Sequence, residues 1–342
     1  MIFENVELHN IAEVQPVEGK NGVRLQRVPE SVRVNLNEGA QMRVLQPDNG
    51  EIRFVSNGSP VKVVLSSTGE TDVTLFYGDF DGRQRFVVGG EPIIIQVGPG
   101  NPRMKEIHPD YKAHLNFSWD VCRLILGGRR REPLILHSIE GESIRPPEPG
   151  EVPELRQLAY GTSITHGFDA EGPHLNYAAQ TAWHLGADLI NLGLGGSAHC
   201  EFQLADYIAE RGDWDIATLA LSVNMQHFKM DEFYKRVSYM VNTVSGKNPD
   251  KLVACITLYP YFRDFGIDST GPEFGGTAEE FRQALRDAVS ACPNDNVYLI
   301  EGTDILKDIR GLTFDLIHPS DNGMIQMGRN LAEKLKEIQK EF

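Results

Sequence analysis

The sequence predicts two parts of different fold class, an antiparallel β-sandwich of the jelly-roll type followed by a doubly wound, flavodoxin-like α/β domain with a parallel sheet. Three observations lead to this prediction. As far as His137, apolar residues recur mostly at every second position. A segment rich in Pro, Gly and Glu then interrupts the pattern between Glu140 and Glu154. Beyond this segment, short apolar runs alternate with stretches of helical period.

The first part is predicted to be all β because an alternation of period two marks strands that have one face in water. Turn residues such as Asn57-Gly58 and Asp81-Gly82 separate the runs. Between Val23 and His137, no segment has both the period and the length of a helix. The clearest strand candidates are residues 51–56, 60–67, 72–80 and 91–97.

The segment from Glu140 to Glu154 has the composition of a stiff linker between domains. We therefore expect the boundary near Gly150, with a β-sandwich domain over residues 1–150 and an α/β domain over residues 151–342.

The second part is predicted to be α/β because strand and helix patterns alternate, which gives a parallel sheet with helices on both faces. Strands are expected at residues 155–160, 188–192, 216–223, 252–259 and 297–301. Helices are expected at residues 177–185, 201–211, 231–245, 278–291 and 321–342.

Charge argues against nucleic acid and membrane surfaces as partners. The 342 residues carry 33 basic and 48 acidic side chains, a net charge of -15, which has the wrong sign for a phosphate backbone or an anionic leaflet. Residues 151–342 hold 16 of the basic and 28 of the acidic side chains, so the second part favours a neutral substrate over an anionic one.

Two further features bear on the location of the protein. No apolar run approaches the roughly 20 residues of a membrane helix, and no basic region followed by an apolar run begins the sequence. The four cysteines are widely spaced without a CxxC pair, so we expect buried thiols and not a zinc site or disulfide framework: Cys122, Cys200, Cys255 and Cys292. From the sequence as given, we expect a cytoplasmic protein.

Four loops that follow strands of the second part carry polar or glycine-rich blocks, and ligands of open parallel sheets bind where strands end. Ser163 lies in YGTSITHG just past the first strand, where its hydroxyl would be exposed at the top of the sheet. Gly195 and Gly196 lie in NLGLGGSAH, and either could offer an N–H group. Asn224 follows the third strand, and its amide could donate to an oxyanion.

The fourth block, FDLIHPSD, places Asp315 three residues before His318. At this spacing the carboxylate can accept from one ring nitrogen while the other ring nitrogen faces a serine hydroxyl. Each block alone has an ordinary explanation, such as a helix cap at Ser163, a turn chosen for its dihedrals at the glycines, or a locally bonded turn residue at Asn224. It is their conjunction at one end of a sheet that indicates nucleophilic catalysis.

These four blocks, in this order over residues 155–342, resemble those of the SGNH (GDSL-type) hydrolase family. By this resemblance Ser163 is the nucleophile, Gly196 the second-block glycine, Asn224 the third-block asparagine, and Asp315 and His318 the acid and the base. Gly196 is preferred over Gly195 because it lies five residues after Asn191, the offset of the family's block.

Three positions depart from the family's usual residues: Thr162, Ser222 and Met225 stand where Asp, Gly and Asp are usual. None of these departures removes a catalytic group. GTSIT preceded by a β-rich domain resembles a bacterial subgroup that includes esterases and acyltransferases.

The resemblance implies acyl transfer through a covalent serine ester, with the oxyanion held by the N–H groups of Ser163 and Gly196 and the Asn224 amide. We expect hydrolysis of a small acyl ester, acetyl by preference, on a carbohydrate or other small alcohol. The alternatives are an acyltransferase that uses the same triad with an alcohol acceptor and a non-catalytic glycan-binding protein. No metal or organic cofactor is expected, because side chains and backbone fill every catalytic role.

Residues near the blocks are candidates for the substrate pocket: His199, Met225, Tyr259 and Tyr261. The long acidic, glycine-rich stretch at 263–277 is predicted to be a flexible loop over the site. For the β-sandwich, a structural role, including the assembly of homo-oligomers, is weighed above independent glycan binding.

Overall fold

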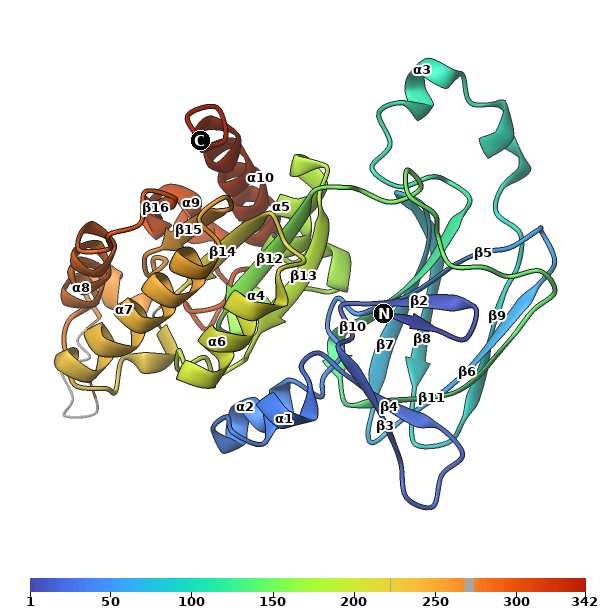
Figure 1. Cartoon of the computed structure of the whole chain (residues 1–342), viewed down its shortest axis with the longest axis horizontal. Coiled ribbons are helices and arrows are strands. Elements are labelled where there is room, and N and C mark those ends of the chain that lie inside the picture. The colour runs from blue at the N-terminus through green and yellow to red at the C-terminus, as the bar shows by residue number, and fades with distance from the viewer. Residues whose placement is uncertain (222, 268–273) are drawn as a thin grey trace.

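The computed structural model describes residues 1–221, 223–267 and 274–342. Its N-terminal part consists of two antiparallel sheets, as predicted (Figure 1). One sheet has the order β1-β2-β5-β10-β7-β8 and the other β3-β4-β11-β6-β9. The strands of the first sheet are β1 (Ile2–Phe3), β2 (Val6–His9), β5 (Glu51–Val55), β7 (Thr71–Tyr77), β8 (Phe80–Val88) and β10 (Val121–Arg131). Those of the second are β3 (Glu13–Pro16), β4 (Val23–Gln26), β6 (Val61–Ser67), β9 (Ile93–Val97) and β11 (Leu134–Glu140).

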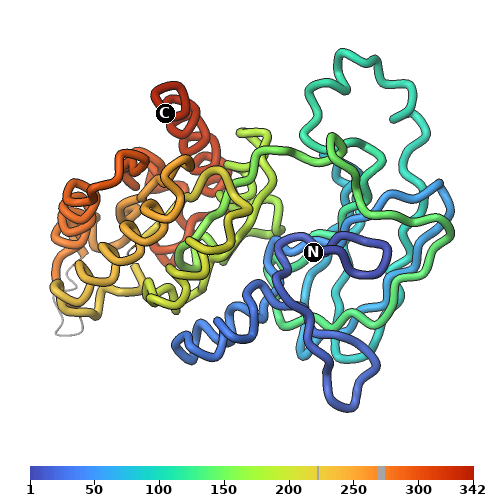
Figure 2. The backbone as a smooth tube through the Cα atoms, in the orientation of Figure 1, coloured from blue at the N-terminus to red at the C-terminus, as the bar shows by residue number. Residues whose placement is uncertain are grey.

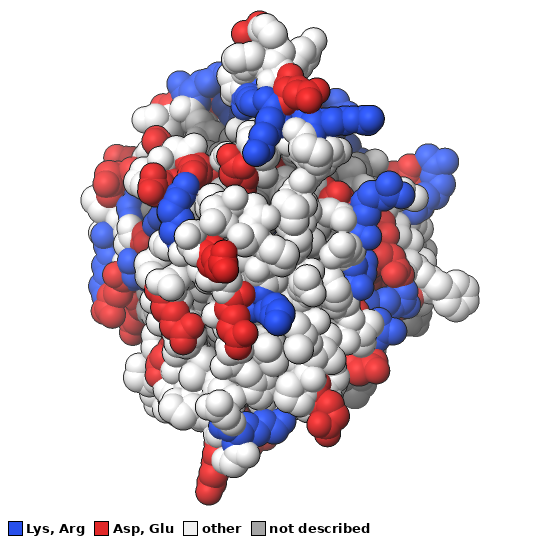
Figure 3. Space-filling model, turned by 90° about the vertical axis from the view of Figure 1, so that its right-hand side faces the viewer, with Lys and Arg blue, Asp and Glu red and all other residues white. Residues whose placement is uncertain are grey.

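The two sheets enclose one apolar core, which the alternating pattern of the sequence supplies. In β6, Val61, Val63 and Leu65 are fully buried while Lys62 is exposed. The other sheet contributes residues such as Phe54 and Leu124 to the same core. The face of the sandwich seen in Figure 3 carries interspersed acidic and basic side chains around a broad uncharged centre.

Short helices interrupt the β-sandwich where the sequence predicts none: α1 (Glu30–Arg33), α2 (Glu38–Arg43), η1 (Pro102–Glu106) and α3 (Pro109–Lys112). Each is too short to show a helical period, which is why the pattern misses them. Helices α1 and α2 extend from the sandwich toward the second part of the chain (Figure 2). Their flanking and inward residues Val28, Leu36, Ala40 and Val44 belong to an apolar core that the second part builds.

The second part contains a parallel sheet in the order β13-β12-β14-β15-β16, which is the flavodoxin-like arrangement predicted from the sequence. Its strands are β12 (Arg156–Gly161), β13 (Asp188–Gly193), β14 (Ile216–Ala220), β15 (Leu252–Ile256) and β16 (Val297–Ile300). Because β13 lies at the edge of this sheet, one side of its backbone has no strand neighbour in the sheet.

Helices cover both faces of the parallel sheet. The core on one face contains side chains of α6 (Phe202–Arg211), α7 (Met230–Lys247) and α8 (Ala278–Ser290). The core on the other contains side chains of α5 (Tyr177–Leu185) and α10 (Asp321–Ile338). The short elements are α4 (Ser163–His166), η2 (Pro173–Leu175), η3 (Val223–Met225), η4 (Phe262–Phe265), α9 (Gly302–Ile305) and η5 (Ile309–Gly311). Within the described ranges, no helix is both long and apolar enough to span a membrane.

Buried polar side chains join the sandwich to the outer edge of β13. The fully buried guanidinium of Arg53 makes two hydrogen bonds to Asp188, of 2.7 and 2.6 Å, and a third to Glu51. His9 Nε2 lies 2.6 Å from the carbonyl oxygen of Leu189. Pairing buried charges in this way offsets their cost of desolvation. Removing one partner would leave the other charge buried and unpaired, which is strongly destabilising.

Candidate active site

Ser163 begins α4 directly after β12, at the carboxyl edge of the parallel sheet. Thr162, in extended conformation, forms the N-cap, so the chain turns sharply from strand to helix at the serine. The Ser163 side chain is nearly buried, and its Oγ lies 2.8 Å from Nε2 of His318. The structure thus brings the first and fourth sequence blocks, 155 residues apart, into hydrogen-bond contact.

His318 is oriented by Asp315, whose Oδ2 lies 2.6 Å from the ring Nδ1. The other carboxylate oxygen accepts from the Ile317 and His318 N–H groups and from the Thr313 hydroxyl, at 2.8 to 2.9 Å. Burial raises the pKa of Asp315, but these hydrogen bonds outweigh it and lower the pKa to about 2. Asp315 is therefore a fixed carboxylate at neutral pH, as the partner of a base must be.

A second carboxylate lies near the same ring nitrogen. Asp169 Oδ2 is 3.5 Å from His318 Nδ1, and Asp169, His318 and Asp315 hold ligand atoms within 4.8 Å of one another. Such a trio could hold a metal ion, yet both ring nitrogens of His318 are already engaged, one by Ser163 and one by Asp315. The geometry therefore fits a base with its orienting acid better than a metal centre.

The second sequence block distinguishes its two candidate glycines. The Gly195 N–H group donates to Nδ1 of His166 at 3.1 Å and is therefore occupied. Gly196 is exposed, has a φ of +70°, and would have open space around an added Cβ. Of the two glycines, Gly196 is therefore the exposed one, and its role as an oxyanion donor stays a prediction.

Asn224 lies on η3, beside the second block. Its Oδ1 accepts from the Ala198 N–H group at 3.2 Å, which orients the side chain. Asn224, Gly196 and Ser163 therefore come from three different loops at the same edge of the sheet.

The remaining residues predicted for the substrate pocket separate into three groups. Tyr259 and Tyr261 line a small hollow of about 10 Å³, together with direct sequence neighbours of Ser163, Asn224 and His318. Met225 is fully buried in the core beneath the sheet and does not line this hollow. His199 is half-buried against the rings of His227 and Phe228, and this burial, with the nearby His227 and Arg236, lowers its pKa to about 4.

The predicted loop at 263–277 falls partly outside the described residues, which omit 268–273. At its described end, the Gly275 N–H group donates to the Gln226 carbonyl at 2.7 Å, and Arg263 Nη2 donates to the Gly276 carbonyl at 2.8 Å.

A separate cavity of about 350 Å³ lies between the sandwich and α5, lined among others by Phe76, Phe117 and Trp183. It reaches Asp188 at the start of β13 and is therefore at the opposite end of this strand from the second block.

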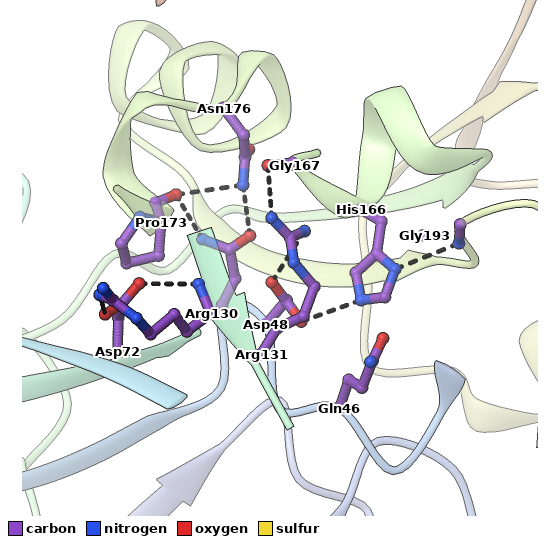
Figure 4. A network of polar contacts seen from close by, with 12 residues as sticks. Gln46, Asp48, Asp72, Arg130, Arg131, His166, Gly167, Pro173, Asn176 and Gly193 are labelled. Carbon is purple, nitrogen blue, oxygen red and sulfur yellow. Dashed lines mark hydrogen bonds and ion pairs between the residues drawn. The ribbon is translucent and has the colours of Figure 1, made fainter. Parts of the chain in front are cut away.

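A buried polar network around His166, shown in Figure 4, is not predicted by the sequence pattern. His166, fully buried, lies 2.9 Å from Asp48 of the sandwich part, and Asp48 also lies 3.4 Å from Arg131. Because Nδ1 of His166 accepts from Gly195, the ring proton is on Nε2 and points at Asp48. Burial lowers the pKa of His166 to about 4, so its ring is neutral at physiological pH. The histidine was visible in YGTSITHG, but its partner lies 118 residues away.

We expect the stability of the protein to fall between pH 6.5 and pH 4, in part because of His166. In this range an unfolded histidine binds a proton that the folded His166 does not bind. The contribution of His166 to the free energy of unfolding is therefore present in full above pH 6.5 and is lost as pH falls toward 4. One such group changes the free energy of unfolding by up to about 3 kcal/mol. Urea unfolding at several pH values should show a shallower pH slope for His166→Gln than for wild type.

The matched control is His114→Gln, which removes an exposed histidine of the sandwich part. Other buried histidines contribute to the wild-type slope, so the informative quantity is the difference between variants. Equal slopes for His166→Gln and wild type would show that His166 is not held neutral in the folded state.

The fold is that of an SGNH-type ester hydrolase preceded by a β-sandwich. The chain belongs to the GDSL-like lipase/acylhydrolase family, whose model matches residues 156–336. A search of curated proteins found no match.

Solved structures of similar fold cover almost the whole chain. Salicylyl-acyltransferase SsfX3 from a tetracycline biosynthetic pathway is 14% identical, with a TM-score of 0.76 over 98% of this chain and 95% of that one. A putative GDSL-like lipase from Bacteroides ovatus is 18% identical, with a TM-score of 0.69 over 98% of both chains. A family two carbohydrate esterase from Clostridium thermocellum, solved with cellohexaose, is 15% identical, with a TM-score of 0.63 over 98% and 99%. At these identities the likeness shows a shared two-part fold.

Proposed function

We propose that this protein is a serine esterase that removes a small acyl group, acetyl by preference, from a carbohydrate or another small alcohol. The observation that carries the proposal is the hydrogen-bonded chain from Ser163 through His318 to Asp315 at the carboxyl edge of the sheet. A hydroxyl, a base and a fixed carboxylate in this order are what nucleophilic catalysis on an acyl carbon requires.

In the proposed mechanism, Nε2 of His318 accepts the Ser163 proton as Oγ attacks the ester carbonyl. Asp315 stabilises the imidazolium that forms. The tetrahedral oxyanion accepts hydrogen bonds from the N–H groups of Ser163 and Gly196 and from Nδ2 of Asn224. His318 then protonates the leaving alcohol, and water activated by the same base releases the acid from the acyl-enzyme.

The preference for acetyl is supported by the hollow that Tyr259 and Tyr261 line. Its volume of about 10 Å³ is roughly the space of one water molecule, which suits a methyl group and not a long chain. Thr162 and Ile164, the chain neighbours of Ser163, belong to its wall, which supports the hollow as the site of the acyl group.

A carbohydrate alcohol is supported by the fold neighbours and by charge. The Clostridium thermocellum esterase was solved with cellohexaose, and another neighbour is an acetyl xylan esterase from Butyrivibrio proteoclasticus. The acidic second part, with 28 acidic against 16 basic side chains, disfavours anionic esters.

Transfer to an alcohol in place of water is the second candidate. The likeness to the salicylyl-acyltransferase, with a TM-score of 0.76 over nearly the whole of both chains, favours keeping it. The same acyl-enzyme serves both reactions, and the acceptor decides between them.

The test is a panel of p-nitrophenyl esters of increasing chain length and of acetylated sugars, with and without added acceptor alcohols, on wild type and Ser163→Ala. We expect kcat/KM to be highest for acetate, acid to be the product, and Ser163→Ala to be inactive. Faster turnover of octanoate would refute the acetyl preference, and ester products formed with an acceptor would establish the transferase. Equal activity of wild type and Ser163→Ala would refute the proposed mechanism.

Asn224→Ala is expected to lower kcat by about a hundredfold or more, because the loss of one oxyanion donor costs roughly 3 kcal/mol. Asn224→Asp is the matched variant, since it keeps an oxygen that can accept from the Ala198 N–H group but offers no donor. Steady-state kinetics on the acetyl ester should show both variants impaired, with folding transitions close to that of wild type. Near-wild-type turnover by either variant would mean that Asn224 is not an oxyanion donor.

A further inference from the structure

Side chains of the N-terminal part hold a row of backbone carbonyls that begins on the edge strand β13 and continues into the second sequence block. Every second carbonyl from residue 189 to residue 197 accepts a hydrogen bond from this part, at distances of 2.6 to 3.0 Å. The pairs, donor first, are His9 with Leu189, Arg27 with Asn191 and Gly193, Arg43 with Gly195, and Asn37 with Ser197. The N-terminal part thus takes the place of a neighbouring strand along this edge.

One of these contacts bears directly on the proposed oxyanion donor. The carbonyl of Gly195 and the N–H group of Gly196 belong to the same peptide unit, and in a planar trans peptide they point in opposite directions. Arg43 Nε donates to the Gly195 oxygen at 2.9 Å, and the Ser197 hydroxyl adds a weaker bond at 3.3 Å. When Arg43 holds this carbonyl, the Gly196 N–H group therefore points away from Arg43, toward the exposed side of the loop.

A peptide between two glycines needs such a restraint, because glycine populates positive and negative φ about equally. A Cβ at Gly195 would lie 2.5 Å from the Phe168 ring, and Gly196 already has a φ of +70°. If this peptide rotated, the Gly195 oxygen would replace the Gly196 N–H group and would repel a developing oxyanion.

We propose that Arg43 is a positioning residue for catalysis, which locks the Gly195–Gly196 peptide so that the Gly196 N–H group faces the oxyanion. This inference rests on the proposed function and deepens it, since it gives the N-terminal part a role in the reaction that the α/β part catalyses.

Helix α2 is built to place Arg43 against this loop. Asn37 caps the helix by accepting from the Ala40 N–H group at 3.0 Å, and a Cβ at Gly39 would overlap the Ser197 hydroxyl. Ala40 packs into the core beside the parallel sheet. At the end of the helix, Arg43 Nη1 donates to Gln46 at 3.2 Å, which fixes the guanidinium.

The same guanidinium lies 5.3 Å from the centre of the Phe168 ring, and Phe168 stacks on His318 at 6.1 Å. Arg43 itself is half-buried, so replacing it leaves no large cavity in the core.

The test compares Arg43→Met with Arg43→Gln, two side chains of equal length. Glutamine places an amide N–H group where the arginine Nε stood, whereas methionine places a methyl group there. We expect Arg43→Met to lower kcat for the acetyl ester by roughly tenfold to a hundredfold, below the full cost of deleting a donor, with KM changed little. Arg43→Gln should recover kcat to within a few fold of wild type.

The control is Arg33→Met on α1, which loses the ion pair with Glu30 in the same segment. It should keep the wild-type kcat, and thermal unfolding of all three variants shows whether the fold is retained. A wild-type kcat for Arg43→Met, or equal losses for the Met and Gln variants, would overturn the positioning role.

The experiment distinguishes a failure of the proposed function from a failure of the positioning role. If wild type has no esterase activity that depends on Ser163, the proposed function fails. If that activity is present and only the pattern of the Arg43 variants is wrong, the positioning role alone fails.

Discussion

Ser163→Ala is expected to lower kcat for an acetyl ester by on the order of 10⁵- to 10⁶-fold. In the proposed mechanism this hydroxyl forms the covalent bond to the acyl group, and alanine has no group that can form it. What remains is the much smaller acceleration that substrate binding and the oxyanion donors give to direct attack by water. Steady-state and single-turnover measurements with the same ester should show the same loss.

The folded state should tolerate this substitution, because the hydrogen bond lost is the one from Ser163 to His318 at the edge of the sheet. Ser290→Ala is a suitable control, since this exposed serine ends α8 in the same part of the chain. Its activity should equal that of wild type. A Ser163→Ala protein with more than about one hundredth of wild-type turnover would contradict the assignment of the nucleophile.

Asp315→Asn is expected to lower kcat by about 10⁴-fold. An amide in place of the carboxylate can no longer stabilise the imidazolium, and it can hold His318 in the wrong tautomer. The hydrogen bonds to Asp315 Oδ1 from the Thr313 hydroxyl and two N–H groups can persist with an amide oxygen, so the loop should keep its shape. Kinetics across pH on the acetyl ester would measure the effect.

Asp169→Asn is the matched comparison, because its carboxylate lies 3.5 Å from the same ring nitrogen, against 2.6 Å for Asp315. We expect a loss of less than about tenfold for Asp169→Asn, since a contact at this distance is outside ordinary hydrogen-bond range. The reverse ranking of the two variants would make Asp169 the orienting acid. Equal losses would mean that the two carboxylates share the role.

The fold could be predicted largely from periodicity, and the errors lie in elements too short to show a period and at the ends of elements. Helix α5 has the predicted bounds, and the alternation in β6 agrees with its burial. The fourth parallel strand was predicted to reach Tyr259 but ends at Ile256. Leu258 and Tyr259 are nevertheless buried. An apolar run indicates burial alone, so it does not distinguish a strand from the covered loop that follows it.

The local part of the site could also be predicted, because the sequence blocks contain the groups themselves. Ser163, Asp315 and His318 were predicted from two short segments, and hydrogen bonds join the three side chains in the structure. The supporting residues could not be predicted in this way. Asp48 and Arg43 lie in the part of the chain that is predicted to be a β-sandwich, more than 100 residues before the loops they contact. Their partners become visible only when α2 and β10 pack against those loops.

In the proposed mechanism, Ser163 is the residue that becomes covalently modified. The most direct measurement is labelling of the whole protein with a fluorophosphonate, followed by mass spectrometry of its peptides. We expect one adduct per chain, located on Ser163 and absent from Ser163→Ala. An adduct on a different residue, or an active wild type that the probe does not modify, would contradict it.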